Sequence, residues 1–342
     1  MESISRIPLA DHDAAPIIAP MQLLIQPLRR VIEVEPGANL LEALRAAQVP
    51  VSYSCMAGRC GTCRCRVSEG TALDAETPPR DDYVLACQTF VTEPCTVEIP
   101  EPDEVVVHPA RIVKATVLAV ESLTHDIRRL VLKPARPIEF SPGQYAQLQF
   151  TPEHARPYSM AGLATDGTME FHVRVVPGGR VSGFVARQLQ PGDAVRVSGP
   201  LGSAYLRRKH DGPMLCVAGG TGLAPILSIL RGAVADGMVQ PVHVYVGARS
   251  PRDVYGLDEL LVLQRQHPSL RLHIVVASGG DPCEMRRGLV TEAIEQDLGD
   301  LQGWRAYLCG SPPMVEAATL LARRKGIAPA HIHADAFYTQ TP

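Results

Sequence analysis

Three closely spaced cysteines and a fourth farther along the chain have the residue types and spacing to hold a metal centre. Cys55, Cys60 and Cys63 lie in the stretch YSCMAGRCGTC, and Cys87 follows in LACQT. This C-x4-C-x2-C spacing with a distant fourth cysteine is that of a plant-type [2Fe–2S] site. Such a cluster transfers one electron at a time, so the spacing predicts a protein that needs an electron donor and an electron acceptor.

The cysteine pattern leaves two alternatives. A structural zinc site would also use thiolates, but it generally takes two short cysteine pairs, and the chain has no second such pair. The fourth ligand is open between Cys87, Cys65 and Cys95. We favour Cys87, because Cys65 falls on an expected strand just past the loop and small buried thiols are common in protein cores.

Residues 156–159 read Arg-Pro-Tyr-Ser after an expected strand. Arg156 offers a planar, permanently charged group for a phosphate, and the hydroxyl of Ser159 can donate or accept a hydrogen bond. Gly178 and Gly179 precede an expected helix, where bare backbone N–H groups can bind a pyrophosphate. A Gly-Gly pair alone is more often only a turn.

A second glycine-rich turn, 219–222, joins an expected strand to a helix with Pro225 in its first turn. It differs from G-x-G-x-x-G and is weak evidence alone. Arg249 ends the next strand, where it would contact an adenosine or a 2′-phosphate, so NADPH stays open; a surface arginine without a ligand is the alternative. Cys309 and Gly310 end a later strand.

The hydrophobic patterns divide the chain into parts with different periodicity. Residues 39–48 predict an amphipathic helix among short strands. Regularly spaced short strands then predict a small antiparallel barrel. In it, His172 and Arg174 share a strand face that is either solvated or beside a cofactor. Alternating strands and helices predict a parallel doubly wound sheet. The predicted ranges are 1–20 for a disordered extension, 21–103 for the cysteine domain, 104–110 for a linker, 111–209 for the barrel and 210–342 for the doubly wound domain.

Composition excludes several classes of protein. Hydrophobic residues make up 46% and charged residues 20% of the chain, as in globular proteins, and the net charge of −3 gives no electrostatic case for nucleic-acid binding. The apolar run 214–230 is broken by glycines and Pro225, which argues against a membrane span. The N-terminus lacks the apolar core of a signal peptide, and nine cysteines without one favour metal binding in a cytoplasmic protein.

The stretches YSCMAGRCGTCRCRV, LACQT, ARPYSMAG, PGGRVS, GGTGLAP, WRAYLCG and ADAFY together resemble one family nearly end to end. It is the family of NAD(P)H-dependent reductases of three-component aromatic-ring-hydroxylating dioxygenases, such as the naphthalene-type systems. Residues 1–20 lie outside the resemblance. It implies a multidomain chain with an N-terminal β-grasp plant-type ferredoxin domain (α+β), an antiparallel β-barrel for FAD and a C-terminal α/β doubly wound nucleotide-binding domain.

The resemblance also implies roles for individual residues. Ser159, Thr221, Cys309 and Phe337 would lie at the reacting rings, with Phe337 or Tyr338 covering the flavin. The metal ligands would be Cys55, Cys60, Cys63 and Cys87. The residues implied to bind FAD or the nicotinamide nucleotide are Arg156, Pro157, Tyr158, Ser159, Gly178, Gly179, Arg180, Val181, Ser182, Gly220, Thr221, Gly222, Arg249, Cys309, Gly310, Phe337 and Tyr338.

The implied activity is electron transfer from NADH, with NADPH possible, through FAD and the internal [2Fe–2S] cluster. The implied acceptor is a separate ferredoxin that feeds an oxygenase of aromatic-hydrocarbon catabolism. One alternative is a reductase that acts directly on a monooxygenase hydroxylase. Another, from a different class, is a redox-sensing protein that uses the same groups only as ligands. The aromatic compound finally oxidised is not encoded in this chain.

Overall fold

The structure is a computed structural model, and it separates into two compact units. One consists of Met1–Val51 and Arg64–Pro102, the other of Ser52–Cys63 and Asp103–Pro342. Most of the predicted extension 1–20, residues 105–107 of the predicted linker, and Cys55 and Cys60 lie outside the described residues. No helix in the described part has the length and apolar character needed to cross a bilayer. The described residues are 19–53, 56, 58, 63–68, 72–74, 83–100, 104, 108–279 and 285–338.

The first unit is built on a mixed sheet in which the first and last strands run parallel at the centre. Its order is β2-β1-β8-β4-β6, and only the β1–β8 pairing is parallel. A smaller sheet has the order β3-β7-β5. This arrangement agrees with the predicted α+β class. The strands are β1 (Met21–Gln26), β2 (Arg30–Val34), β3 (Ala38–Asn39), β4 (Arg64–Ser68), β5 (Ala72–Asp74), β6 (Tyr83–Leu85), β7 (Thr89–Val91) and β8 (Cys95–Glu98).

The helix of this unit, α1 (Leu40–Ala46), supports the turn that carries Cys87. Asn39 is its N-cap and accepts a hydrogen bond from the Glu42 N–H at 3.2 Å. The Asn39 side chain also donates to the Cys87 carbonyl at 3.0 Å, and the Leu41 N–H donates to the carbonyl of Ala86. The predicted helix 39–48 is therefore confirmed with slightly shorter bounds, since Asn39 caps it from outside.

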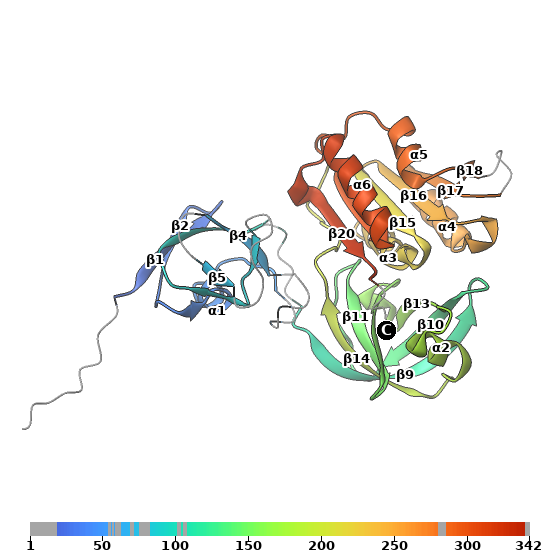
Figure 1. The fold of residues 1–342 in the computed structure, drawn as a ribbon, viewed down its shortest axis with the longest axis horizontal. Coiled ribbons are helices and arrows are strands. Elements are labelled where there is room, and N and C mark those ends of the chain that lie inside the picture. The colour runs from blue at the N-terminus through green and yellow to red at the C-terminus, as the bar shows by residue number, and fades with distance from the viewer. Residues whose placement is uncertain are drawn as a thin grey trace, which may run out of the picture. The chain divides into compact units, whose positions relative to one another are not determined.

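A six-stranded antiparallel barrel opens the second unit (Figure 1). Its order is β12-β11-β14-β9-β10-β13, and a bridge between Met160 and Phe171 brings the two edges together. Inward-facing side chains of all six strands form its core. The elements are β9 (Arg111–Ser122), β10 (Ile127–Pro134), β11 (Tyr145–Thr151), β12 (His154–Ser159), η2 (Ala164–Asp166), β13 (Met169–Arg174), α2 (Arg180–Arg187) and β14 (Ala194–Leu201).

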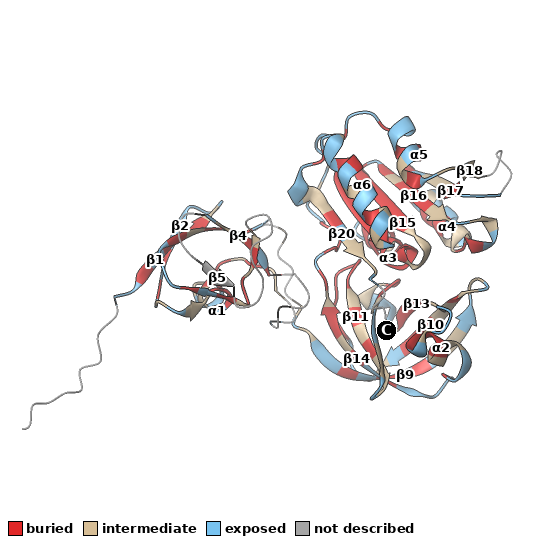
Figure 2. Ribbon diagram, in the orientation of Figure 1, coloured by how far each residue is buried: buried red, intermediate tan, exposed pale blue. Residues whose placement is uncertain are grey.

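A parallel sheet of order β18-β17-β16-β15-β19-β20 completes this unit. Helices α3 and α4 cover one face and α5 and α6 the other, so the central strands are almost wholly buried (Figure 2). The strand order reverses between β15 and β19, as in the predicted doubly wound fold. The elements are β15 (Met214–Gly219), η3 (Gly220–Gly222), α3 (Leu223–Ala235), β16 (Val242–Ala248), η4 (Pro251–Asp253), α4 (Leu257–Gln266), β17 (Leu270–Val276), β18 (Arg286–Arg287), α5 (Val290–Asp297), β19 (Arg305–Gly310), α6 (Pro312–Arg324), η5 (Pro329–His331) and β20 (Ile332–Ala336).

The glycine turn after β15 packs against the end of β19 at backbone contact distance. A Cβ atom on Gly222 would lie 2.1 Å from the carbonyl oxygen of Cys309. Gly222 has φ −60°, which any residue adopts in a helix, so its need for glycine is steric and not conformational. The missing side chain lets helix α3 start directly against β19.

We therefore expect Gly222→Ala to separate β15 from β19 and to destabilise the second unit by roughly 1–3 kcal/mol, the usual cost of overpacking. Thermal unfolding followed by circular dichroism measures the loss. Gly299→Ala is the matched control, because a Cβ there has no heavy atom within 4 Å. Equal melting temperatures for the two variants would contradict the steric interpretation.

Candidate functional site

A cavity of about 540 Å³ lies at the carboxyl ends of the parallel strands. Its walls come from the turn after β15, the ends of β16 and β17, the start of α6 and the C-terminal segment. The switch point of a doubly wound sheet is the general position of a nucleotide crevice, and this cavity occupies it. Lining residues of the predicted site are Gly220, Thr221, Arg249, Phe337 and Tyr338, with Arg174 added from the barrel.

The predicted glycine-turn residues are brought together by backbone packing. Gly220 has a positive φ of +55°, and Gly222 lies against Cys309. Gly310 has φ +146°, and a Cβ there would approach the Gly219 carbonyl oxygen to 2.9 Å. Because two backbones meet without intervening side chains, Thr221 and its neighbouring N–H groups can approach a dinucleotide closely.

Ser159 and Asp335 do not line the cavity, but Ser159 of the barrel contacts the C-terminal strand that leads to the lining residue Phe337, and we call this region the inner end of the site. Its hydroxyl donates to the Asp335 carboxylate at 3.3 Å. Burial raises the pKa of Asp335 to about 6, although the bond from Ser159 acts in the opposite direction. Asp335 is paired in register with Cys309, whose thiol is fully buried; burial raises its pKa well above the usual range. Cys309 is therefore a neutral thiol at physiological pH and not a nucleophile.

Sequence reasoning singled out Ser159 and Cys309 but gave Asp335 no role of its own. Its only signal was its place in the segment ADAFY. The pairing of β20 with β19 brings it to the site, and this edge strand was not predicted. Beyond the strand, the Phe337 N–H donates to the Gly310 carbonyl at 2.8 Å. This bond anchors the end of the chain at the cavity, where Tyr338 is 75% exposed.

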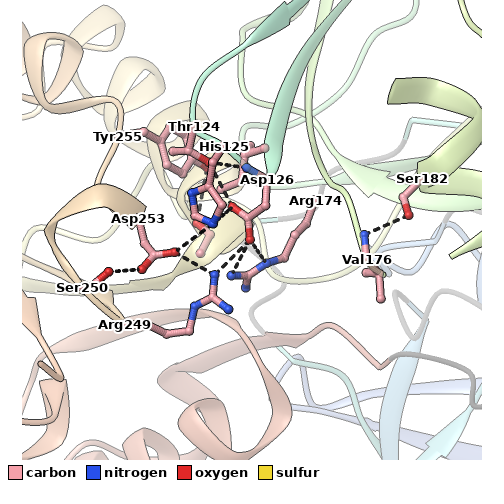
Figure 3. A network of polar contacts seen from close by, with 12 residues as sticks. Thr124, His125, Asp126, Arg174, Val176, Ser182, Arg249, Ser250, Asp253 and Tyr255 are labelled. Carbon is pink, nitrogen blue, oxygen red and sulfur yellow. Dashed lines mark hydrogen bonds and ion pairs between the residues drawn. The ribbon is translucent and has the colours of Figure 1, made fainter. Parts of the chain in front are cut away.

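The barrel supplies the residues predicted for a flavin. Arg156 is exposed on β12, while Tyr158 is partly buried, and burial raises the pKa of its phenol. Gly179 is the N-cap of α2, and the Ser182 hydroxyl accepts from the Val176 N–H at 3.1 Å (Figure 3). A Cβ on Gly179 would lie 2.6 Å from that hydroxyl. The first backbone N–H groups of α2 have no acceptor within the helix and follow a tight turn, so they suit a pyrophosphate. Arg156 adds a positive charge to the same domain.

His172 lies inside the boundary between the barrel and the parallel sheet. It is 5% exposed, so the interpretation of its strand face as solvated is wrong for this residue. Its Nε2 is 3.1 Å from Glu170, and its Nδ1 is 3.0 Å from the hydroxyl of Tyr255. The same hydroxyl donates to the Gly220 carbonyl at 3.3 Å. This chain of contacts ties the predicted flavin strand to the predicted nucleotide turn.

The direction of these bonds follows from counting hydrogens. Burial opposes the ionisation of Glu170, but bonds from His172 and Arg129 lower its pKa to about 2, so it is an acceptor. Nε2 of His172 therefore carries a hydrogen. Tyr255 has a single hydroxyl hydrogen, which it donates to the Gly220 carbonyl.

At the other end of the cavity, Arg249 is engaged by two carboxylates. Its Nη2 lies 2.9 Å from Asp126 of the barrel and 2.7 Å from Asp253 of η4 (Figure 3). Asp126 also accepts two bonds from Arg174, both at 3.1 Å. Sequence reasoning named Arg249 and missed both aspartates: Asp126 lies in the segment HDIRRL, which contributed to the family resemblance without a role for this residue, and it is far from Arg249 in sequence.

Two of the four predicted cluster ligands are described. Cys63 and Cys87 are buried, and the Gln88 side chain lies 3.7 Å from the Cys87 sulfur as a donor. Cys65 and Cys95 belong to neighbouring sheet strands. Burial first, and Cys95 second, raise the pKa of Cys65 to about 12, which suits a packed thiol. A positive φ at Gly58 shows the permissive backbone that a loop around a cluster requires.

Three domain families match successive parts of this chain. Residues 23–92 match the 2Fe-2S iron-sulfur cluster binding domain. Residues 114–205 match the oxidoreductase FAD-binding domain, and residues 216–319 match the oxidoreductase NAD-binding domain. The matches follow the same order as the sheet, the barrel and the parallel sheet described above.

Curated relatives match over almost the whole length. The reductase component of naphthalene 1,2-dioxygenase/salicylate 5-hydroxylase systems from a Ralstonia species is 59% identical, covering 93% of this chain and 99% of the relative. That of the naphthalene 1,2-dioxygenase system from Pseudomonas putida is 57% identical, with the same coverage. The reductase subunit of an aromatic O-demethylase from Amycolatopsis is 36% identical over 90% of this chain and 96% of the relative.

Solved structures agree with the domain order. A cytochrome P450 reductase from Amycolatopsis aligns with a TM-score of 0.70 at 34% identity, covering 93% of this chain and 98% of that chain. The ferredoxin reductase in carbazole 1,9a-dioxygenase aligns with a TM-score of 0.65 at 28% identity and the same coverage. Similarity in fold and in sequence therefore extends over the same three domains.

Tyr255→Phe tests whether the hydroxyl at the domain boundary positions the nucleotide turn. It removes the bonds to His172 and Gly220, so we expect NAD⁺ to bind about fivefold more weakly, the effect of one hydrogen bond of roughly 1 kcal/mol. Isothermal titration of the oxidised protein measures this. Tyr245→Phe is the control, because its hydroxyl bonds Asp297 instead. Equal losses in both variants would contradict the positioning role.

Asp335→Asn tests the raised pKa of this carboxyl. A folded-state pKa near 6 against an ordinary value of 3.8 means that the folded state binds the extra proton. Wild-type stability therefore falls as the pH rises through about 6, relative to the asparagine variant, and changes little above that. Melting temperatures of both proteins from pH 5 to 8 give the difference. A difference independent of pH would refute the burial of this charge.

Proposed function

The chain belongs to the family of oxygenase reductase components that combine ferredoxin, flavin-binding and nicotinamide-binding domains, and from this membership we propose that it transfers electrons from NAD(P)H to a ferredoxin. The acceptor is a separate [2Fe–2S] protein that serves an aromatic-ring dioxygenase of the naphthalene type. The enzyme is thus a ferredoxin–NAD(P)⁺ reductase, acting in the cytoplasm in the catabolism of aromatic hydrocarbons.

One observation carries this proposal: identity of 59% and 57% to two reductases of naphthalene dioxygenase systems, over 93% of the chain. Reductase components of propane 2-monooxygenases have 32–34% identity. The domain architecture is common to both groups, so the preference for a ferredoxin acceptor rests on this difference in identity. We assign residues 21–103 to the ferredoxin domain, 104–110 to the linker, 111–209 to the flavin domain and 210–342 to the nicotinamide domain.

In this activity the protein binds and orients its cofactors and keeps water away. Bound flavin supplies the conversion between a transferred hydride and single electrons. Arg156 and the N-terminus of α2, from Gly178 to Ser182, would hold the phosphates of FAD. Ser159 presents its hydroxyl at the inner end of the site, where its bond to Asp335 fixes its direction. Holding two rings in a fixed orientation accounts for much of the rate enhancement of such reactions.

The nicotinamide side is organised by the backbone. The turn at Gly220, Thr221 and Gly222 would bind the dinucleotide, and the buried Cys309 and Gly310 would lie beside the nicotinamide ring. Phe337 lines the same cavity, where an aromatic ring can cover the flavin when no nucleotide is bound. Cys55, Cys60, Cys63 and Cys87 would hold the cluster.

The function is tested by adding NADH without oxygen to the protein reconstituted with iron, sulfide and FAD, with the ferredoxin of a naphthalene dioxygenase system as acceptor. We expect catalytic reduction of the ferredoxin, and much slower reduction of a monooxygenase hydroxylase component supplied without one. The reverse order of rates would favour the direct monooxygenase alternative. Absence of turnover with both acceptors would remove the reductase assignment.

Cys87→Ser separates the two halves of the electron path. We expect loss of the visible cluster spectrum and of ferredoxin reduction, while NADH-dependent reduction of a dye at the flavin continues, because different domains carry the two sites. Cys65→Ser and Cys95→Ser are matched controls and should keep the cluster. A full-strength cluster in Cys87→Ser, or its loss in a control, would move the fourth ligand to another cysteine.

A further inference from the structure

We propose that Asp126 and Asp253 make this reductase select NADH over NADPH by holding Arg249 in ion pairs at the adenosine end of the cavity. The inference rests on the proposed function and deepens it, since it names the form of the nucleotide that the site accepts. It assigns a discriminating role to two residues that belong to neither glycine motif.

The position of these residues is the starting point. Arg249 follows β16, the strand next to β15, and it lines the cavity together with Asp253. In doubly wound folds this region contacts the adenosine ribose: a carboxylate there accepts from the 2′-hydroxyl of NAD, whereas a nearby arginine accommodates the 2′-phosphate of NADP. This site has both an arginine and carboxylates. The ion pairs between them therefore decide whether the arginine or a carboxylate is available to the ribose.

Arg249 is shared between the carboxylates of two domains. Figure 3 shows its guanidinium between Asp126, from the turn between β9 and β10, and Asp253. The distances of 2.9 and 2.7 Å are those of charge-assisted hydrogen bonds. Arg174 donates to the same oxygen of Asp126, Oδ2, as Arg249 does. The whole side chain of Arg249 is 63% exposed, but its guanidinium is directed into this network.

Both carboxylates are fixed in place and charged. The Asp253 side chain is 8% exposed and accepts from the Ser250 hydroxyl at 2.5 Å. Burial opposes its ionisation, but the bonds from Ser250 and Arg249 lower its pKa. Burial likewise opposes the ionisation of Asp126, and the bond from Thr124 and the charge of Arg174 lower its pKa. Neither group needs a ligand to be satisfied.

The charges of this network cancel. Two arginines face two aspartates, so a 2′-phosphate would meet no net positive charge and would have to displace a carboxylate from Arg249. A 2′-hydroxyl needs no such exchange, because it can donate to a carboxylate that is already in place. Rejection of the phosphate thus comes from repulsion built into the site, a common device for specificity.

A divalent cation is a weaker explanation for the same residues. His125, Asp126 and Asp253 have ligand atoms within 4.8 Å of one another. However, Arg174 and Arg249 already bind the two carboxylates, and a cation would have to displace them. The arrangement therefore fits an arginine partner better than a metal.

The experiment compares kcat/KM for NADH and NADPH in the full protein with bound FAD and cluster. Wild type should prefer NADH. Asp253→Asn removes one repulsive charge and releases Arg249 from one of its two carboxylates, so kcat/KM for NADPH should rise up to about fivefold, the effect of one partly exposed charge interaction. The KM for NADH should rise at the same time. Asp126→Asn should shift the preference in the same direction, and the double variant should shift it further.

Binding provides a readout that is independent of hydride transfer. Calorimetry with adenosine 5′-monophosphate and adenosine 2′,5′-bisphosphate should show the same shift of preference toward the 2′-phosphate in Asp253→Asn. Asp297→Asn is the matched control, because Asp297 pairs with Arg286 in the same domain and neither residue lines the cavity. It should keep the wild-type preference for both pairs of ligands.

Three results would overturn the proposal. They are equal use of both nucleotides by wild type, parallel changes for both nucleotides in the aspartate variants, and loss of NADPH use alone in Arg249→Gln. The last would mean that Arg249 already binds the 2′-phosphate in wild type. If neither nucleotide reduces the flavin, the proposed function fails, and the calorimetric preference for the two adenosine phosphates still decides this inference.

Discussion

The site depends on one steric constraint, the backbone contact between the turn after β15 and the end of β19. A side chain on Gly222 would overlap the carbonyl of Cys309, and one on Gly310 would approach that of Gly219. The contact places two strand ends and the start of α3 around one cavity wall made largely of backbone. Bare N–H groups and the absence of side chains are what a dinucleotide phosphate requires. Helix packing on both faces of the sheet then keeps the two strands in register.

A second layer of interactions orients this wall toward the barrel. His172 and Tyr255 connect β13 to the Gly220 carbonyl, and Ser159 reaches Asp335 on the edge strand. These are polar contacts of 3.0–3.3 Å among partly or fully buried groups, so loss of one partner costs more than the contact contributes. Hydride transfer needs two rings held at a fixed separation and angle. A boundary with directional hydrogen bonds defines that angle better than an apolar boundary would.

The fold was largely predictable, since strands such as 214–219 are continuous apolar runs and the glycine turns mark their ends. The chemistry was also predictable, from the cysteine spacing and the glycine motifs. Each of these motifs lies largely within a short stretch of sequence. The unpredicted parts join distant segments: Asp126 with Arg249, His172 with Tyr255, and β20 with β19. β20 is too short and too polar to show the alternating hydrophobic pattern that predicts a strand. Only its pairing with β19 in the structure identifies it as one.

The polar groups of the site divide by position into two kinds. At the Arg249 end, the charges of two arginines and two partly or fully buried aspartates are paired and balanced, so the four groups satisfy one another. At the inner end, Cys309 is a neutral thiol, and burial raises the pKa of Asp335 to about 6, so this carboxyl is protonated more readily than an ordinary aspartate. A hydride carries its electron pair without needing a general base. The chain therefore needs no titrating group to move the hydride, and the bond from Ser159 to Asp335 serves to position the barrel against the edge strand.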